Sequence, residues 1–524
     1  MQLRPGYLVV SDLHVGAGRD PETGLLSRRE DFLFDEEFAA FLAHHAEAPE
    51  WWDVAWTLVI AGDFLDFLQI SEVGPAAVRA PRDAEPPRLR RDPVFGLKAG
   101  PRESAAKLRR AVAGHTVLFR ALASFARRYR LVIVSGNHDA EFIYPEVREE
   151  LVRILAELAD APVEELRPRV KFRPWFHLEE GIYIEHGHQY DGWNSFHYVL
   201  DPRLPEMNHL SPEDREDLEL PLGSLFVRYL FNRIELENPI ADNLKPPSRF
   251  LLWFVLHEPV RALRFLFTGG RLMLRRLHTK SRPLLAERYR PRAARHRATA
   301  RRMVRALADE GAVPAIDTEL LDRLADLAAR PVWGPAGRFS TWTFRLLLHP
   351  WTLLPAAAGL SALTAAGCAW VALRLFAPLL PGAAAEFTAT LGELLGPWEN
   401  LLLACFWAVA AATLSAFHRL SRPDTRGRDR LRERAAKISE LTGARYVVLG
   451  HTHDADRQVL PGGVYFNSGT WTKVFSPAER VSRDDRELTF VRLVRQDGGY
   501  AAELLRWEAA AVPARPARIL RDPR

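Results

Sequence analysis

The sequence predicts an α/β protein in which two packed sheets are interrupted by a long helical insertion. Three observations support this fold class. Apolar, β-branched runs alternate with helical patterns over residues 1–200, and the same alternation returns over residues 419–524. Between them the chain becomes first basic and then strongly apolar. Because helices separate the strands and polar turns follow them, we expect one domain built from both ends of the chain.

The expected domains follow from these changes of pattern. Residues 1–200 and 419–524 form the two parts of the α/β domain, residues 201–345 a basic helical insertion, and residues 346–418 an apolar helical hairpin. The expected strands are 7–10, 56–61, 131–135, 182–185, 446–449, 463–466, 487–494 and 500–507. The expected helices include 30–45, 105–128, 146–158 and 431–441. His115 lies within the second of these helices, so we expect it on a helix surface.

The composition limits the classes of protein to which the chain can belong. With 524 residues, 48% of them hydrophobic, it is long enough for more than one simple domain. Its two cysteines, Cys368 and Cys405, lie in apolar runs, which argues against a disulfide framework and a cysteine metal site. A core strand is expected as early as Tyr7, so we expect no secretory signal.

Five short polar motifs each come directly after one of the expected strands. They are Asp12-Leu13-His14, Gly62-Asp63-Phe64-Leu65-Asp66, Gly136-Asn137-His138-Asp139, His186-Gly187-His188 and Gly450-His451-Thr452-His453. A single Asp or His at a strand end is usually a solvated turn residue or a cap. Five such motifs instead predict one shared site, because the sites of α/β proteins lie at the carboxyl ends of strands.

The residue types in these motifs match the needs of a centre with two divalent metal ions. Carboxylate, imidazole and amide groups suit manganese, iron or zinc, of which we expect manganese first. The expected metal ligands are Asp12, His14, Asp63, Asn137, His186, His451 and His453, with Asp63 bridging both ions. Two such ions about 3.5–4 Å apart can activate a water and neutralise phosphoryl charge. The motifs therefore indicate hydrolysis of a phosphate ester.

In this order, the motifs resemble those of the calcineurin-like metallophosphoesterase superfamily. The resemblance implies a four-layer αββα sandwich. It also implies one metal ion bound by Asp12, His14, Asp63 and His453, and another bound by Asp63, Asn137, His186 and His451. It places His138 beside the scissile group, as a general acid or a stabiliser of the transition state. By the same resemblance Asp139 orients His138, Asp66 supports the metal ligands, and residues 467–471 buttress the site.

Two further polar residues follow the fourth motif. His188 and Asp191 belong to the segment His-Gly-His-Gln-Tyr-Asp. We expect them to line the substrate pocket or to hold the metal ligands, and the alternative is ordinary loop polarity. This segment and residues 223–229 also resemble a set of bacterial membrane phosphoesterases.

The apolar part of the insertion predicts a transmembrane hairpin. Residues 346–373 contain no Asp, Glu, Lys or Arg, and residues 401–417 form a second apolar run. About 20 apolar residues span a bilayer. Arginines flank the pair, while Glu386 and Glu393 lie between the runs, so the positive-inside rule places the catalytic domain in the cytoplasm. The alternative is a buried helical hairpin in a soluble domain.

The region before this hairpin is strongly basic. Residues 261–305 are rich in Lys and Arg, and Glu287 is their one acidic residue. Apolar and basic residues interleave there, which favours a helix on a membrane interface. Binding to nucleic acid and a solvated helix face are the alternatives.

These features together favour a membrane-anchored phosphoesterase that acts on lipid-linked or other cytosolic phosphoesters, and a phosphorylated or pyrophosphate-linked lipid fits its location best. Its motifs are similar to those of the UDP-2,3-diacylglucosamine diphosphatases. The chain departs from that family at His138 and His188, where the family has Arg and Asp, and in its membrane insertion. The alternatives are a nuclease or nucleotide phosphodiesterase of the same superfamily, and a catalytically inactive membrane scaffold.

Overall fold

The computed structural model describes part of the chain. The described residues are 3–73, 89, 91–92, 95–203, 218–236, 290–309, 317–332, 382, 386, 390, 425–476, 481–482, 486–508 and 514–516. They form a mixed α/β structure with two mixed sheets. One compact unit comprises Met1–Pro247, Arg275–Arg338 and Thr425–Arg524, and a second comprises Ser248–Leu274 and Phe339–Asp424.

The larger sheet has seven strands in the order β16-β15-β14-β1-β2-β5-β6. Four of them run parallel: β1 (Arg4–Val10), β2 (Val54–Ala61), β5 (Arg130–Val134) and β6 (Val170–Arg173). The other three continue the sheet in antiparallel pairs: β14 (Thr489–Gln496), β15 (Gly499–Trp507) and β16 (Ala514–Pro516). Strands from the two ends of the chain therefore share one sheet, as the sequence predicted.

The smaller sheet has five strands in the order β10-β11-β9-β8-β7. They are β7 (Phe176–Glu179), β8 (Ile182–Glu185), β9 (Tyr446–Leu449), β10 (Asp456–Leu460) and β11 (Gly463–Asn467). In its centre β9 is parallel to both β8 and β11. The short pairs β3 (Arg91–Asp92) with β4 (Gly96–Leu97), and β12 (Phe475–Ser476) with β13 (Val481–Ser482), lie outside both sheets. Every expected strand is present, with ends within three residues of those predicted.

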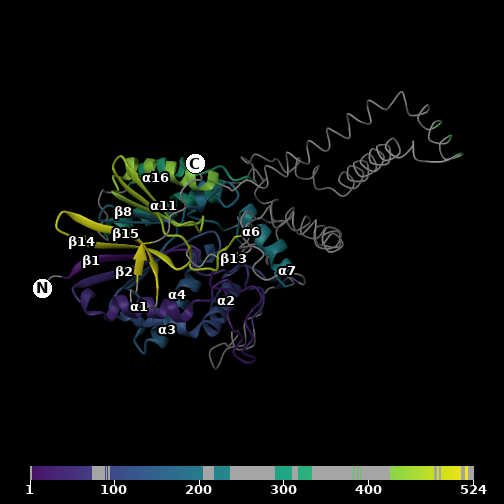
Figure 1. Cartoon of the computed structure of the whole chain (residues 1–524), viewed down its shortest axis with the longest axis horizontal. Coiled ribbons are helices and arrows are strands. Elements are labelled where there is room, and N and C mark those ends of the chain that lie inside the picture. The colour runs from purple at the N-terminus through teal and green to yellow at the C-terminus, as the bar shows by residue number, and fades with distance from the viewer. Residues whose placement is uncertain are drawn as a thin grey trace. The chain divides into compact units, whose positions relative to one another are not determined.

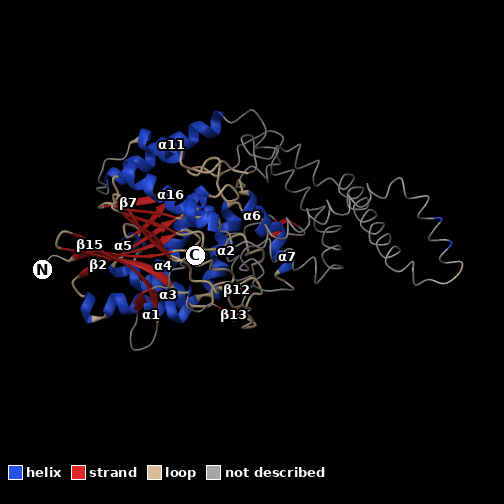
Figure 2. Ribbon diagram, turned by 45° about the horizontal axis from the view of Figure 1, so that its top comes forward, coloured by secondary structure: helices blue, strands red, loops and turns tan. Residues whose placement is uncertain are grey.

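The two sheets pack face to face through the alternation of side chains along their strands. Tyr7 and Val9 of β1 share one buried core with Ile182 and Ile184 of β8. Figures 1 and 2 show helices on both outer sides of the sheets. The arrangement is compatible with the expected α/β sandwich.

The outer helices fall into two groups. Beside the larger sheet lie α1 (Asp35–Glu47), α2 (Pro101–Gly114), α3 (Thr116–Arg128) and α4 (Pro145–Leu158). Beside the smaller sheet lie α11 (Arg290–Asp309), α12 (Thr318–Ala325) and α16 (Thr425–Thr442). Shorter helical turns are η1 (Pro49–Trp51), η3 (Ala140–Ile143), α5 (Val163–Leu166), η4 (His188–Tyr190), α6 (Leu222–Phe226), η5 (Val227–Phe231) and α7 (Asn232–Ile234).

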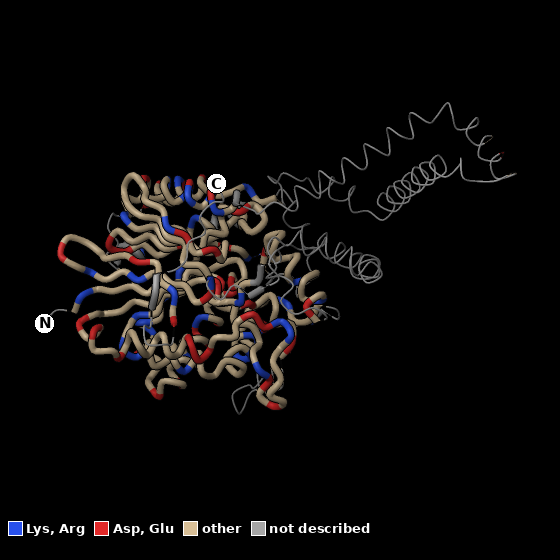
Figure 3. The backbone as a smooth tube through the Cα atoms, viewed as in Figure 1, with Lys and Arg blue, Asp and Glu red and all other residues tan. Residues whose placement is uncertain are grey.

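Part of the expected insertion belongs to the unit that contains the sheets. On α11, Ala300 and Met303 join a buried core with Leu324 of α12 and Ile438 of α16. Ala300 and Met303 of α11 are therefore covered by protein. Residues 261–289, which make up most of the basic region expected on a membrane interface, lie outside the described residues, so that expectation stays a prediction. Basic and acidic residues are interspersed along the described chain (Figure 3).

The compact units end at other residues than the expected domains. The expected boundaries lie at residues 200 and 345, whereas the segments of the unit that contains the sheets end at Pro247 and Arg338.

The expected transmembrane hairpin lies outside the described residues, except for Gly382, Glu386 and Thr390. Among the helices that the structure describes, none has both the length and the apolar composition needed to cross a membrane. The hairpin therefore stays a prediction.

The expectation for His115 was wrong, because this residue is buried and interrupts the predicted helix. It lies between α2 and α3 and is 2% exposed. Its Nε2 lies 3.2 Å from Glu30 Oε2, and its Nδ1 lies 3.0 Å from Asp35 Oδ2. Burial by itself lowers the pKa of His115, but these two carboxylates outweigh burial and raise it to about 9. The charged imidazole thus ties the helices to the chain that follows β1.

Replacing His115 with Gln is expected to lower the unfolding temperature in a pH-dependent manner. Because the folded state raises the pKa of His115, its stabilising effect is complete below the unfolded pKa of about 6.5. It is lost as the pH rises through about 9. The difference in unfolding temperature between wild type and His115→Gln should therefore shrink between pH 6.5 and pH 9.5, as measured by scanning fluorimetry. A difference that is constant over this range would contradict the ion pairs.

Candidate metal centre

The five predicted motifs meet where parallel strands of both sheets end. Asp12 and His14 follow β1, Asp63 follows β2, and Asn137 follows β5 of the larger sheet. His186 follows β8, and the pair His451 and His453 follows β9, in the smaller sheet. The loops are joined by backbone hydrogen bonds, from Asp12 N to Gly62 O (3.1 Å) and from Gly450 N to His186 O (2.8 Å). The structure therefore brings all the expected ligand loops to one edge of the sandwich.

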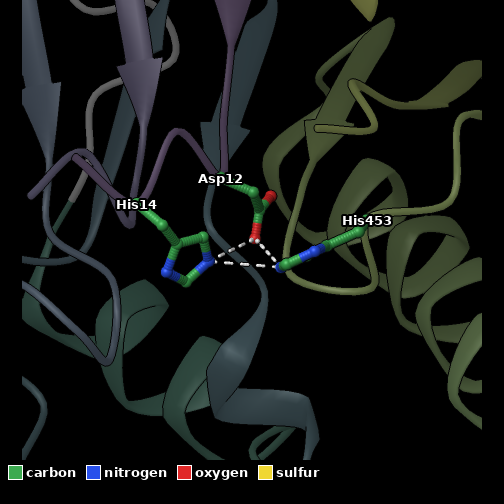
Figure 4. A group of neighbouring side chains, drawn as sticks. All are labelled: Asp12, His14 and His453. Carbon is green, nitrogen blue, oxygen red and sulfur yellow. Dashed lines mark hydrogen bonds and ion pairs between the residues drawn. The ribbon is translucent and has the colours of Figure 1, made fainter. Parts of the chain in front are cut away.

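One group of ligands consists of Asp12, His14 and His453 (Figure 4). The Nε2 atom of His453 lies 3.2 Å from Asp12 Oδ1 and 3.2 Å from His14 Nε2. Each residue offers one ligand atom, and the three atoms lie within 4.8 Å of one another. These residues come from both ends of the chain and form a group that could hold one metal ion.

A second group consists of Asp63, His186 and His451, whose ligand atoms also lie within 4.8 Å of one another. Asp63 Oδ2 is 3.1 Å from His186 Nε2 and 3.6 Å from His14 Nε2. One carboxylate therefore faces imidazoles of both groups, which is the position that a bridging ligand requires. Asp63 and His14 also form a group with His138 in which one possible ligand atom of each residue lies within 4.8 Å of the others.

Three buried polar atoms support the fit of these residues to metal ions. They are Asp12 Oδ1, Asn137 Oδ1 and His186 Nε2. None of them makes a hydrogen bond of good geometry within the described part of the chain, although His453 Nε2 lies 3.2 Å from Asp12 Oδ1 and Asp63 Oδ2 lies 3.1 Å from His186 Nε2. Asn137 is 3% exposed, and Asp12 and His186 are fully buried. Buried polar atoms are rarely left in this state, because the loss of hydration costs about 1–3 kcal/mol each. All three belong to expected ligands, and a bound cation would satisfy them.

The backbone of the site is strained at the ligands themselves. Left-handed φ angles occur at Asp12 (54°), His14 (49°), Asp63 (51°), His451 (73°) and His453 (58°). Such conformations cost about 1–3 kcal/mol each for residues other than glycine and cluster at functional sites. These left-handed turns direct the side chains of several expected ligands toward one small volume. A regular strand or helix would point neighbouring side chains in different directions.

Two glycines allow the ligand loops to approach closely. Gly62 has φ 84°, and a Cβ atom there would lie 2.4 Å from His186 Cγ. A Cβ atom on Gly136 would lie 2.1 Å from Asp63 Oδ1. Any larger residue at either position would displace an expected ligand.

The electrostatic environment is dominated by carboxylates and imidazoles in close contact. Burial lowers the pKa of His186, but Asp63 and Asp12 outweigh it and raise the pKa to about 9. Burial raises the pKa of Asp12 and Asp63, but neighbouring imidazoles outweigh it and hold both pKa values below the usual range for aspartate. The carboxylates are thus ionised at neutral pH, as metal ligands must be.

His138 is oriented by Asp66 and not by Asp139, so the expected partner was wrong. Asp66 Oδ2 lies 2.6 Å from His138 Nδ1 and 3.2 Å from His14 Nδ1. Asp139 instead accepts hydrogen bonds from the backbone N–H groups of Phe64 (2.8 Å) and Gly136 (2.5 Å). Burial, together with the Asp63 charge, raises the pKa of Asp139 to about 7. Asp139 therefore fixes the loops that carry Asp63 and Asn137.

The two residues expected to line a substrate pocket lie behind the ligands. His188 is 1% exposed, and its ring centre is 5.3 Å from that of His186. Burial holds the pKa of His188 below its usual value. Asp191 Oδ2 lies 3.3 Å from His451 Nε2. Since that nitrogen is occupied by Asp191, Nδ1 of His451 is the nitrogen left for a metal ion. These positions suit the second expected role of these residues, holding the metal ligands in place, better than contact with substrate.

Residues 467–471 hold two ligand loops together, as the resemblance implied. Thr470 Oγ1 donates to Asp12 O (2.8 Å), and Trp471 N donates to the same oxygen (3.2 Å). Asn467 Nδ2 donates to Gly450 O (2.8 Å), and Ser468 Oγ lies 2.7 Å from Ser11 Oγ. This segment therefore fixes the loop after β1 against the loop after β9.

Two residues near the site were missed in the sequence. Asn194 Oδ1 accepts a hydrogen bond from Asn137 Nδ2 (3.5 Å), and Ser224 Oγ donates to Asn137 O (3.2 Å). Neither follows an expected strand, and Ser224 falls in the expected insertion. One feature of the sequence pointed to the region of Ser224, namely the resemblance of residues 223–229 to membrane phosphoesterases.

Comparison with protein-family models, curated proteins and solved structures found no match for the chain. The support for a metal centre therefore comes from the residues alone, because the structure contains groups of Asp and His side chains that could hold a metal ion.

Asp63→Asn is expected to lose most of the bound metal while the protein remains folded. The change removes the charge of the carboxylate that faces both groups of imidazoles but keeps its shape. Metal content after incubation with Mn²⁺ and gel filtration would be measured by mass spectrometry. Asp53→Asn is a matched control, because Asp53 lies before β2, at the end opposite to Asp63, and pairs with Arg4 at 2.6 Å. Wild-type metal content in Asp63→Asn would contradict the bridging role.

Proposed function

We propose that the chain is a phosphoesterase of the calcineurin-like metallophosphoesterase superfamily that depends on two divalent metal ions. The observation that carries this proposal is the buried Asp63 carboxylate, which faces His14 of one ligand group and His186 of the other. The unpaired Oδ1 of Asn137 adds the amide oxygen expected of the second group. A catalytically inactive scaffold is disfavoured, because the expected ligand set is complete.

The donor set suits manganese, iron or zinc, since it combines imidazole, carboxylate and amide groups. Asp12, His14, Asp63 and His453 would hold one ion, and Asp63, Asn137, His186 and His451 the other. When bound, such a pair supplies an activated hydroxide and neutralises the charge on phosphoryl oxygens. Asp191 contacts His451, and Asp66 contacts His14. Such contacts hold the imidazoles of the two proposed ligands in position.

His138 is the proposed proton donor to the leaving oxygen. Its Nδ1 lies 2.6 Å from Asp66 Oδ2, and we assign the contact with the substrate to Nε2. A protonated Nε2 can donate to a departing alkoxide or stabilise charge on the phosphoryl group.

The proposed place of action is the cytoplasmic face of a membrane, and the proposed substrate is a lipid-linked phosphate ester or pyrophosphate. Support comes from the sequence: two apolar runs at 346–373 and 401–417, with arginines outside the pair and acidic residues between. A nuclease or nucleotide phosphodiesterase of the same superfamily is the alternative.

The proposed activity is tested with two generic substrates, bis(p-nitrophenyl) phosphate and p-nitrophenyl phosphate. The full chain, purified in detergent and stripped with a chelator, is expected to be inactive and to regain hydrolysis with Mn²⁺. The ratio of the two rates separates a diesterase from a monoesterase. No hydrolysis of either substrate with Mn²⁺, Fe²⁺ or Zn²⁺ would overturn the proposal.

His138→Ala is expected to lower kcat by about 10²–10⁴-fold, the range of general acid–base assistance. Metal content should stay near that of the wild type, because Asp66 still holds His14. The two measurements are steady-state hydrolysis and metal analysis of the same sample. Equal loss of metal and activity would assign His138 to the ligands instead.

The protein is expected to remain with membranes through high-salt and alkaline washes, and to leave only with detergent. Salt would weaken an attachment that depends on basic residues alone, because it screens their charges. A hairpin inserted in the bilayer would not be released by salt, because it is held in the hydrocarbon and satisfies its backbone hydrogen bonds within its helices. A cysteine at Glu386 should react with an impermeant thiol reagent from outside, and one at Arg428 should not. Release by salt alone would remove the hairpin and favour the nuclease alternative.

A further inference from the structure

The segment that carries Asp191 is bound by two parts of the chain that are far from it in the sequence. One part follows α12. There Ala329 N donates to Gln189 O (2.7 Å), and Val332 N donates to Gly192 O (2.7 Å). These two hydrogen bonds hold the backbone on both sides of Asp191.

The carbonyl of Tyr190 is bound by the other part of the chain. Arg430 of α16 donates from Nη1 to Tyr190 O (3.2 Å). Residues 329–332 precede, and Arg430 follows, the Phe339–Asp424 part of the second compact unit. Segment 189–192 is therefore held by residues that come before and after that part of the chain.

The three segments are also in close contact. A Cβ atom on Gly192 would lie 2.9 Å from Arg330 O. Tyr190 is 1% exposed and shares a buried core with Leu324 of α12 and Leu431 of α16. Apolar packing and backbone hydrogen bonds therefore act on segment 189–192 together.

Segment 189–192 reaches the metal centre through one carboxylate. Asp191 Oδ2 lies 3.3 Å from His451 Nε2 and accepts a hydrogen bond from Asn194 Nδ2 (2.8 Å). A contact of this kind fixes the orientation of a ligating imidazole, and its loss typically costs about 10- to 100-fold in metal affinity. Because His451 belongs to the second group of expected ligands and not to the first, a displacement of this segment would weaken the binding of the second ion.

We propose that residues 329–332 and Arg430 control the occupancy of the second metal site by positioning Asp191. This inference rests on the proposed two-metal function and adds a regulation of the same site. A change between residues 333 and 424 that moves either segment would be transmitted to His451. Because such coupling is reciprocal, binding of the second ion also stabilises the two segments.

The first test measures metal binding by the full chain in detergent, stripped with a chelator and titrated calorimetrically with Mn²⁺. The wild type is expected to bind two ions. Arg430→Met should weaken one site by about 2- to 12-fold, the net value of one hydrogen bond, and leave the other unchanged. Electron paramagnetic resonance distinguishes a coupled pair of Mn²⁺ ions from a single ion, so the signal of the pair should require more Mn²⁺ in the variant.

Matched variants separate positioning from a general loss of structure. Arg430→Lys keeps a donor and should restore most of the affinity. Lys437→Met removes the same charge from the same helix, where Lys437 pairs with Glu433 at 2.8 Å, and should leave both sites unchanged. Ala329→Pro removes the donor to Gln189 and should weaken the same site as Arg430→Met, whereas Ala329→Ser keeps it. Unchanged affinities in Arg430→Met and Ala329→Pro, or equal weakening of both sites, would overturn the inference.

The second test uses the reciprocal effect of the metal on the two segments. Occupancy of the second site by Mn²⁺ should slow hydrogen exchange at the amides of Ala329 and Val332, and exchange that is unaffected by Mn²⁺ would overturn the inference. Neither test depends on turnover. Two-site binding without hydrolysis would overturn the proposed function alone, and binding of fewer than two ions by the wild type would overturn both.

Discussion

The contact of Asp63 with imidazoles from two different sheets holds the candidate centre together. His14 follows β1 of the larger sheet, His186 follows β8 of the smaller one, and Asp63 Oδ2 lies 3.6 Å and 3.1 Å from their Nε2 atoms. Because Asp63 is 2% exposed, its charge must be balanced by nearby groups rather than by water. The face-to-face packing of the sheets is what brings those groups to it.

The contacts behind the ligands explain how a strained site persists. Several ligands have left-handed backbone angles, which the surrounding structure has to stabilise. The segment 467–471 binds the loop after β1 to the loop after β9. Asp139 does the same for the loops after β2 and β5. The ligand geometry is thus fixed by hydrogen bonds to backbone atoms, which do not depend on a metal ion.

The site also extends beyond the two segments that carry its motifs. Ser224, on α6, donates to the carbonyl of Asn137, and the same helix supplies Phe226 as a neighbour of Trp193. Helix α6, which lies between the two motif-bearing segments in the sequence, therefore contributes contacts near the site.

The sequence by itself determined eight of the strands, the loops that carry the motifs and the identity of the expected ligands, whereas β6, β7 and β10 were not expected. These features are local, since periodic apolar runs define strands and polar residues directly behind them define the strand-end loops. Only the tertiary structure decided which side chains become partners. His138 pairs with Asp66, 72 residues away in the chain, rather than with the adjacent Asp139. His115 is buried against Glu30 and Asp35 where its helical pattern predicted exposure. Such pairs join residues that are far apart in the sequence. The local sequence pattern does not indicate these contacts, because they form only when the segments pack together.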